Sequence, residues 1–202
     1  MNFFKNLFHV GSVFRIGFIL VVLFLSACAG TVKKQIADEQ VNVQIEMKKQ
    51  FEQAVEHQNN GKYDQAKAIY QSLLSQNSAL ISPSLNLGII AVKQTQTDEA
   101  KKYFDAVLSI DPKQNTALTY LALLAREAGK FDQAESYLRQ ILEVEPNNLN
   151  AIRNLGILLD LYRGRLAEAL VLYEKYQSLQ VEPDPQLKDW IFDTRNRLKA
   201  VQ

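Results

Sequence analysis

Cysteine and histidine are the usual zinc ligands and frequent catalytic groups, and this chain has few of either. The 202 residues include one cysteine, Cys28, and two histidines, of which only His57 lies beyond the apolar N-terminal segment. This set cannot supply a zinc site built on His and Cys, and no base or cation stands beside Cys28 to stabilise a thiolate. A Ser-His-Asp arrangement would depend wholly on His57. We therefore predict no enzymatic activity, no metal and no dissociable cofactor, with an enzyme built on His57 as the distant alternative.

The segment before Cys28 has the layout of a secretory signal peptide. Residues 1–15 carry two basic residues and no acid, and residues 16–27 read "IGFILVVLFLSA". A membrane-spanning helix needs ~20 predominantly apolar residues, and this run is shorter. The pattern favours a signal peptide over residues 1–27, with an uncleaved anchor as the alternative.

The four residues "LSAC" that end at Cys28 resemble the lipobox of bacterial lipoproteins. The resemblance implies cleavage before Cys28 and a covalent diacylglyceryl and N-acyl lipid on that residue, and two or more acyl chains anchor a protein stably. Ala29 replaces the aspartate that favours inner-membrane retention in enterobacterial lipoproteins, so the resemblance implies the periplasm-facing side of the outer membrane in a Gram-negative source. Residues 28–40 are predicted to be a tether with a reach of ~40 Å.

The charge balance argues against a nucleic-acid partner. The chain has 23 Lys and Arg against 22 Asp and Glu, and removing the two basic residues of the leader leaves 21 against 22. A nucleic-acid-binding surface usually shows a basic excess. With its only cysteine lipidated, the protein forms no internal disulfide, so packing must provide its stability. No small-molecule substrate is predicted either.

From residue 41 onward, four residue classes repeat with one period of 34. Small residues recur at Ala54, Gly88, Ala122 and Gly156. A second set of small residues recurs at Ala66, Ala100, Ala134 and Ala169, with one extra residue before the last. Large apolar residues follow at Tyr70, Phe104, Leu138 and Tyr173, and prolines stand at Pro112 and Pro146. Such a period predicts one helix-turn-helix unit that is repeated along the chain.

The order of small, small, aromatic and proline positions resembles the tetratricopeptide repeat. Close helix contact needs small side chains, the aromatic residues fill the space between helix pairs, and proline ends the second helix. The predicted fold is an all-α solenoid of about four repeats at residues 47–80, 81–114, 115–148 and 149–182, within residues 41–182. Residues 183–202 are predicted to form a capping helix, because the last repeat of an array leaves an apolar face uncovered.

Three departures from the period carry specific predictions. Thr95 stands where the other repeats have a turn glycine. One extra residue between Gly156 and Gly164 predicts a longer or bulged helix near Tyr162, read as structural drift with a functional bulge as the alternative. In the last helix an apolar stripe includes Trp190, which is predicted to be the main anchor of the cap, with a partner-binding role as the alternative.

In tetratricopeptide arrays the first helices of successive repeats line a concave groove. Helical spacing places a mixed polar and apolar set there, and we predict that these residues bind a peptide or helix. The predicted groove residues are Phe51, Val55, Asn86, Ile89, Lys93, Tyr120, Leu123, Arg126, Arg153, Asn154 and Ile157, and the same spacing adds Glu127 and Asp160. Phe51 and Val55 stand where carboxylate-clamp domains use lysine and asparagine, which favours a hydrophobic or mixed ligand.

The two resemblances together imply a membrane-tethered, non-enzymatic adaptor that binds envelope proteins through its groove. Lipoproteins of this build assist the assembly of type IV pili and their secretins, which is the favoured function. The alternative is a scaffold for peptidoglycan hydrolases and synthases or another envelope complex.

Overall fold

The computed structural model describes residues 38–182 and 184–200, so Cys28 and the predicted signal peptide lie outside the described residues. The chain divides into two compact units, Met1–Glu52 and Gln53–Gln202. Residues 38–52 of the first unit are helical, and the second unit begins with helical residues 53–59. No helix within the described ranges is long and apolar enough to cross a bilayer.

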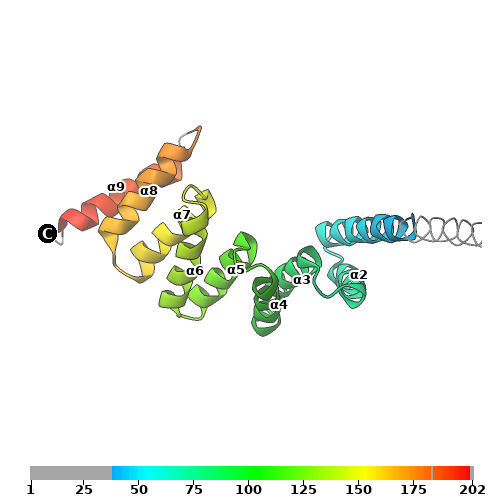
Figure 1. Ribbon diagram of the computed structural model, residues 1–202. Helices are drawn as coiled ribbons and strands as arrows, with labels where there is room; N and C mark the ends of the chain where they lie inside the picture. Colours follow the sequence, from blue (N-terminus) through cyan, green and yellow to red (C-terminus); the bar gives the residue numbers. More distant parts are fainter. Residues whose placement is uncertain (1–37, 183, 201–202) are drawn as a thin grey trace, which may run out of the picture. The chain divides into compact units, whose positions relative to one another are not determined.

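The second unit is a succession of helices joined by short turns (Figure 1). They are α2 (Tyr63–Gln76), α3 (Ile81–Lys93), α4 (Thr97–Ile110), α5 (Asn115–Glu127), α6 (Phe131–Val144), α7 (Leu149–Ile157), the π-helical turn η1 (Leu158–Tyr162), α8 (Leu166–Leu179) and α9 (Pro185–Ala200). Helix α3 packs on α4, α5 on α6 and α7 on α8, while α4 contacts α5 and α6 contacts α7. The part of the chain that the structure describes contains no strand, as the all-α prediction requires.

The repeat period seen in the sequence is a packing period. Tyr70, Phe104 and Tyr173 are fully buried, as predicted. A Cβ atom on Gly88 would lie 2.6 Å from the ring of Phe104, and one on Gly156 would lie 2.7 Å from the ring of Tyr173. Each of these two rings therefore rests against bare backbone of the preceding helix. That contact explains why small and aromatic residues recur at one fixed separation.

The prolines mark the ends of the second helices, as predicted. Helices α4 and α6 both end two positions before a proline, at Pro112 and Pro146. The residue before each proline is non-helical, because the proline ring crowds its backbone. Gln114 and Asn148 then start the next helices, since each side chain accepts a hydrogen bond from the backbone N–H three positions later, at 2.9 and 3.0 Å.

Thr95 adopts the backbone conformation of the glycine it replaces. Its φ is 59°, against 71° at Gly129 and 64° at Gly164 in the equivalent turns. A β-branched residue rarely takes this left-handed conformation, which costs about 1–3 kcal/mol. The geometry of the repeat thus imposes a left-handed backbone on Thr95, although threonine by itself disfavours that conformation.

The extra residue of the fourth repeat forms the π-helical turn η1. Helix α7 ends at Ile157, and one widened turn follows from Leu158 to Tyr162. The predicted bulge is confirmed at the predicted place. A π-turn absorbs one added residue within a helix and redirects the side chains that follow it.

Helix α9 caps the array by packing on α8. Leu187, Ile191 and Thr194 are its buried residues, whereas Trp190 is only partly buried. Trp190 packs against the same core cluster as Leu187 and Ile191, and its role as the main anchor of the cap stays a prediction. The centre of its ring lies 5.9 Å from that of Tyr173 on α8.

Candidate functional site

A pocket of about 310 Å³ lies between α5 and α7. Four predicted groove residues line it, and they are Tyr120, Leu123, Arg126 and Asn154. Its lining consists of Thr119, Tyr120, Ala122, Leu123, Arg126, Ala134, Leu138, Asn150, Asn154 and Leu158. Helix α5 supplies the phenol and the cation, α7 supplies two asparagine amides, and α6 closes the apolar floor.

Tyr120 is held in place by an aromatic neighbour. Its ring stacks on Phe104 of α4, with the centroids 5.1 Å apart and the planes 6° from parallel. Phe104 is fully buried and fixed against Gly88. The phenol of Tyr120 is thus presented to the pocket by rigid packing, which lowers the entropy lost when a ligand binds.

Arg126 is the cation of the pocket, and the π-turn positions it. Its guanidinium carbon lies 5.9 Å over the ring of Tyr162, the last residue of η1. Tyr162 in turn lies 5.1 Å from Phe131. The Nε atom of Arg126 is buried and finds no hydrogen-bond partner among the residues that the structure describes. Leaving such a donor unpaired costs about 1–3 kcal/mol.

Other predicted groove residues lie outside this pocket. The side-chain amide of Asn86 donates to the backbone carbonyl of Ser82, at 2.9 Å within its own helix. Arg153 lies over the indole of Trp190, with its guanidinium carbon 6.0 Å from the ring centre. The remaining predicted residues that do not line the pocket are Val55, Ile89, Lys93, Glu127, Ile157 and, in the first unit, Phe51.

Asp160, which the sequence placed in the groove, does not line the pocket between α5 and α7 and takes part in the contact with the cap instead. It is 7% exposed. Its carboxylate accepts hydrogen bonds from the hydroxyls of Tyr173 and Thr194, at 3.3 and 3.1 Å, and forms an ion pair with Arg197. Burial raises the pKa of Tyr173, and the nearby carboxylate of Asp160 raises it further by a smaller amount. The phenol therefore keeps its proton and can donate the hydrogen bond to Asp160.

A second cavity of about 520 Å³ adjoins this contact. Its lining consists of Ile157, Asp160, Leu161, Tyr173, Trp190, Asp193 and Arg197. The two carboxylates here already have Arg197 as a partner, with Asp193 at 2.9 Å from its Nε. Sequence reasoning missed this polar contact, although Thr194 stands one full repeat length after Asp160, at the same place in the period.

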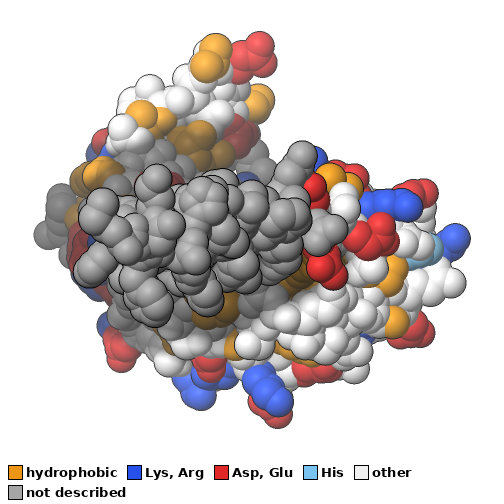
Figure 2. Space-filling view, turned by 45° about the vertical axis from the view of Figure 1, so that its right-hand side comes forward, with side chains coloured by type: hydrophobic (Ala, Val, Ile, Leu, Met, Phe, Trp, Pro, Cys, Tyr) orange, Lys and Arg blue, Asp and Glu red, His pale blue; other side chains and the backbone are white. Residues whose placement is uncertain are grey.

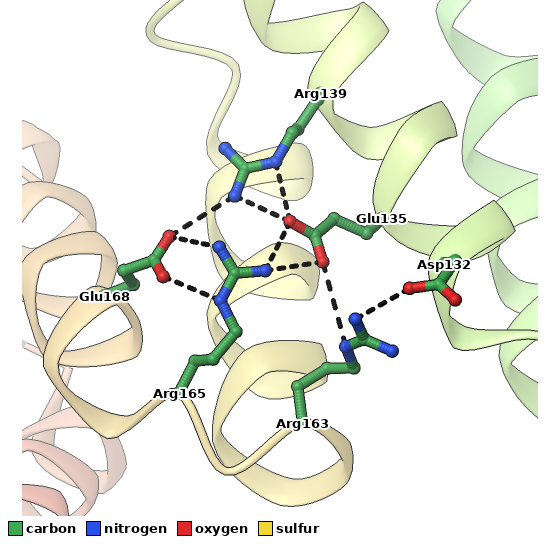
Figure 3. Close-up of polar contacts among 6 residues, drawn as sticks. All are labelled: Asp132, Glu135, Arg139, Arg163, Arg165 and Glu168. Carbon is green, nitrogen blue, oxygen red and sulfur yellow. Dashed lines mark hydrogen bonds and ion pairs between the residues drawn. The ribbon is translucent and has the colours of Figure 1, made fainter.

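Sequence reasoning also missed an ion-pair network that joins the third and fourth repeats (Figure 3). Glu135 of α6 accepts from Arg139 at 2.8 Å and from Arg165, before α8, with both oxygens at 2.8 Å. Arg165 also donates to Glu168 of α8 at 2.6 Å. Burial alone would raise the pKa of Glu135, but the hydrogen bonds from Arg139 and Arg165 outweigh it and lower the pKa.

Elsewhere the charges are mixed. Figure 2 shows basic and acidic side chains next to one another on the face in view, which matches the near-neutral composition. No group of three or more potential metal ligands occurs within residues 38–182 and 184–200. Arg126 differs from the network arginines in having no carboxylate partner among the described residues.

Comparisons with known proteins agree with the repeat pattern. One family model of the tetratricopeptide repeat matches residues 59–126, and a second matches residues 121–186. The chain therefore belongs to the tetratricopeptide-repeat proteins, whose domains are generally scaffolds for protein–protein interaction rather than catalysts.

Solved structures show the same fold. MamA from AMB-1 is 23% identical over 77% of this chain and 84% of its own, with a TM-score of 0.62. A tetratricopeptide repeat protein from Parabacteroides merdae ATCC 43184 is 22% identical over 74% of this chain and 58% of its own, with a TM-score of 0.63. At these identities the likeness concerns the fold alone. No curated protein sequence matches the chain.

Proposed function

We propose that this protein is a lipid-anchored adaptor that binds envelope proteins through the pocket between α5 and α7. The observation that carries the proposal is the meeting of Tyr120, Leu123 and Arg126 with two asparagine amides in one pocket. Apolar walls with side-chain amides suit a peptide, because the amides can bond its backbone while the walls take its side chains.

A photo-crosslinking residue tests the pocket directly. Leu123 lines the pocket, whereas Ser136 lies on α6 outside it and serves as the matched control. Crosslinking in living cells should join an envelope protein to the Leu123 position and leave the Ser136 position unreacted. Equal capture at both positions, or none at Leu123, would contradict the proposal.

The anchor rests on the lipobox at Cys28. We place the protein on the periplasm-facing side of the outer membrane, held by the diacylglyceryl and N-acyl chains. Labelled fatty acid should mark the wild-type chain and not Cys28→Ser. A Cys28→Ser variant that keeps the label would remove the basis for this location.

The favoured pathway is assembly of type IV pili or their secretin, which rests on the resemblance to pilus-assembly lipoproteins. Deleting the protein from its host should abolish surface pili or secretin multimers. Normal piliation with normal secretin multimers would overturn this pathway. Native pull-down of peptidoglycan hydrolases or synthases would favour the alternative scaffold.

A further inference from the structure

The pocket between α5 and α7 has an uncompensated positive charge. Its lining contains Arg126 and two asparagines but no aspartate or glutamate. No ion pair joins Arg126 to another residue in the described part of the chain, and its buried Nε has no acceptor there. The arginines outside the pocket show the opposite behaviour, since Arg139 and Arg165 both donate to Glu135.

The next repeat shows what this position accommodates. Asp160 stands one full repeat length after Arg126, at the same place in the period. There a side chain of α9 reaches Asp160, and Arg197 forms the ion pair. In the fourth repeat this position holds a carboxylate that is paired with an arginine of the neighbouring helix. In the third repeat it holds a guanidinium that has no carboxylate partner among the described residues.

Packing keeps the guanidinium at the pocket. The ring of Tyr162 lies 5.9 Å from it, and Tyr162 itself belongs to the π-turn that the extra residue creates. A guanidinium binds a carboxylate through parallel hydrogen bonds, whereas the amides of Asn150 and Asn154 can bond a peptide backbone. Leu123 and Leu138 leave an apolar wall beside that position.

We propose that the pocket selects a segment of a partner protein in which an acidic side chain stands next to an aliphatic one. The carboxylate binds Arg126, and the aliphatic side chain packs against Leu123 and Leu138. The selection rests on the proposed protein-binding function of this pocket and adds the chemistry of its partner. The site lies between the third and fourth repeats and does not include Phe51 or Val55.

Capped peptide libraries test the charge selection. Octapeptides with a fixed central Leu-Glu and randomised flanks, acetylated and amidated at their ends, are presented to the full-length chain in detergent. A matched library carries Leu-Gln, which differs in charge alone. The wild-type chain should retain the Leu-Glu library at least about 5-fold better, and Arg126→Gln should bring that ratio to about one.

Two variants control for folding and for charge in general. Arg139→Gln removes an arginine of the ion-pair network around Glu135, outside the pocket, and should keep the preference for Leu-Glu. Arg126→Lys keeps the charge but loses the fork geometry, and should show an intermediate ratio. Circular dichroism must give the same helix content for all variants. A preference that persists in Arg126→Gln, is absent from wild type, or appears only with uncapped peptides would overturn the proposal.

Failure of this selection is separable from failure of the adaptor function. If Leu123 crosslinks an envelope protein whose capture is unchanged by Arg126→Gln, the pocket binds a partner without selecting a carboxylate. If Leu123 captures nothing while the Leu-Glu preference holds in the library, the acidic selection stands and the cellular role falls.

Discussion

Arg126 and Asp160 occupy equivalent places in successive repeats, and their surroundings differ completely. Arg126 lies at the open pocket between α5 and α7 with a buried donor unpaired in the described chain. Asp160 is buried and contacted by Tyr173, Thr194 and Arg197. The same point of the repeat lines a cavity in both places, but only at the end of the array does a neighbouring helix, α9, supply an ion-pair partner.

This difference shows that one repeat position can have two kinds of surroundings. In the last repeat a polar contact fixes the cap, whose apolar stripe is narrow. In the third repeat the same position faces the pocket, and its charge has no carboxylate partner among the described residues. An unpaired buried donor lowers stability unless a ligand satisfies it. Removing Asp160 should therefore cost stability, and removing Arg126 should cost binding.

The largest effect is expected from Asp160→Ala. The substitution leaves the hydroxyls of Tyr173 and Thr194 and the guanidinium of Arg197 without their shared acceptor. We expect a loss of about 2–3 kcal/mol in the free energy of unfolding, since orphaned buried groups cost about 1–3 kcal/mol and Arg197 keeps access to water. Urea unfolding measures it, with Asp193→Ala on α9 as the control. A loss no larger than that of an ordinary surface substitution, below about 0.5 kcal/mol, would mean that apolar packing alone holds α9.

Gly156→Ala should give the next largest effect. Its Cβ would lie 2.7 Å from the ring of Tyr173, which is fully buried, so the ring would have to shift. Overpacking of this kind costs about 1–3 kcal/mol, and we expect about 1–2 kcal/mol in urea unfolding. The third repeat carries Ala122 at this place opposite the smaller Leu138, so Ala122→Gly tests the reverse change. If Gly156→Ala is neutral, the fourth repeat packs less tightly than the structure shows.

Glu135→Gln probes the outer contact between the same two repeats and should have a smaller effect. The arginines lower the pKa of Glu135 in the fold, so its contribution is present above the ordinary pKa of about 4.3 and is lost as the pH falls through the lowered pKa. We expect a loss of at most about 1 kcal/mol at neutral pH, reduced by salt. In acid the unfolding free energies of the variant and wild type should converge. A difference that persists in acid would assign the effect to packing.

Arg126→Gln should have the smallest effect on stability. The variant loses the contact with Tyr162, worth about 0.5–1 kcal/mol, and also removes an unpaired buried donor, so the two changes nearly cancel. We expect a change within about 0.5 kcal/mol in urea unfolding while the Leu-Glu preference disappears. A loss above about 1.5 kcal/mol, more than a typical hydrogen bond contributes, would make Arg126 a structural residue and remove the contrast with Asp160.

The sequence was informative where residues repeat and misleading where a contact joins distant helices. The period located the helix pairs, the buried rings and the bulge at Tyr162, because small and large side chains must match at every interface. It placed Asp160 in the groove because helical spacing extrapolates through α7, whereas the π-turn and α9 enclose that carboxylate. Around Glu135, the pair with Arg139 has the i,i+4 spacing of one helix, whereas Arg165 comes from 30 residues further along the chain and reaches Glu135 only in the folded array.

The all-α repeat architecture and the family follow from residue order alone, because a regular packing period of this length has few structural solutions. Residue order also carries the resemblance to a lipobox at Cys28, which lies outside the described residues. Only the packed helices decide which polar side chains have a hydrogen-bond or ion-pair partner and which have none among the described residues. That outcome depends on the helix that crosses each residue, since α9 reaches Asp160, while no described segment brings a carboxylate to Arg126.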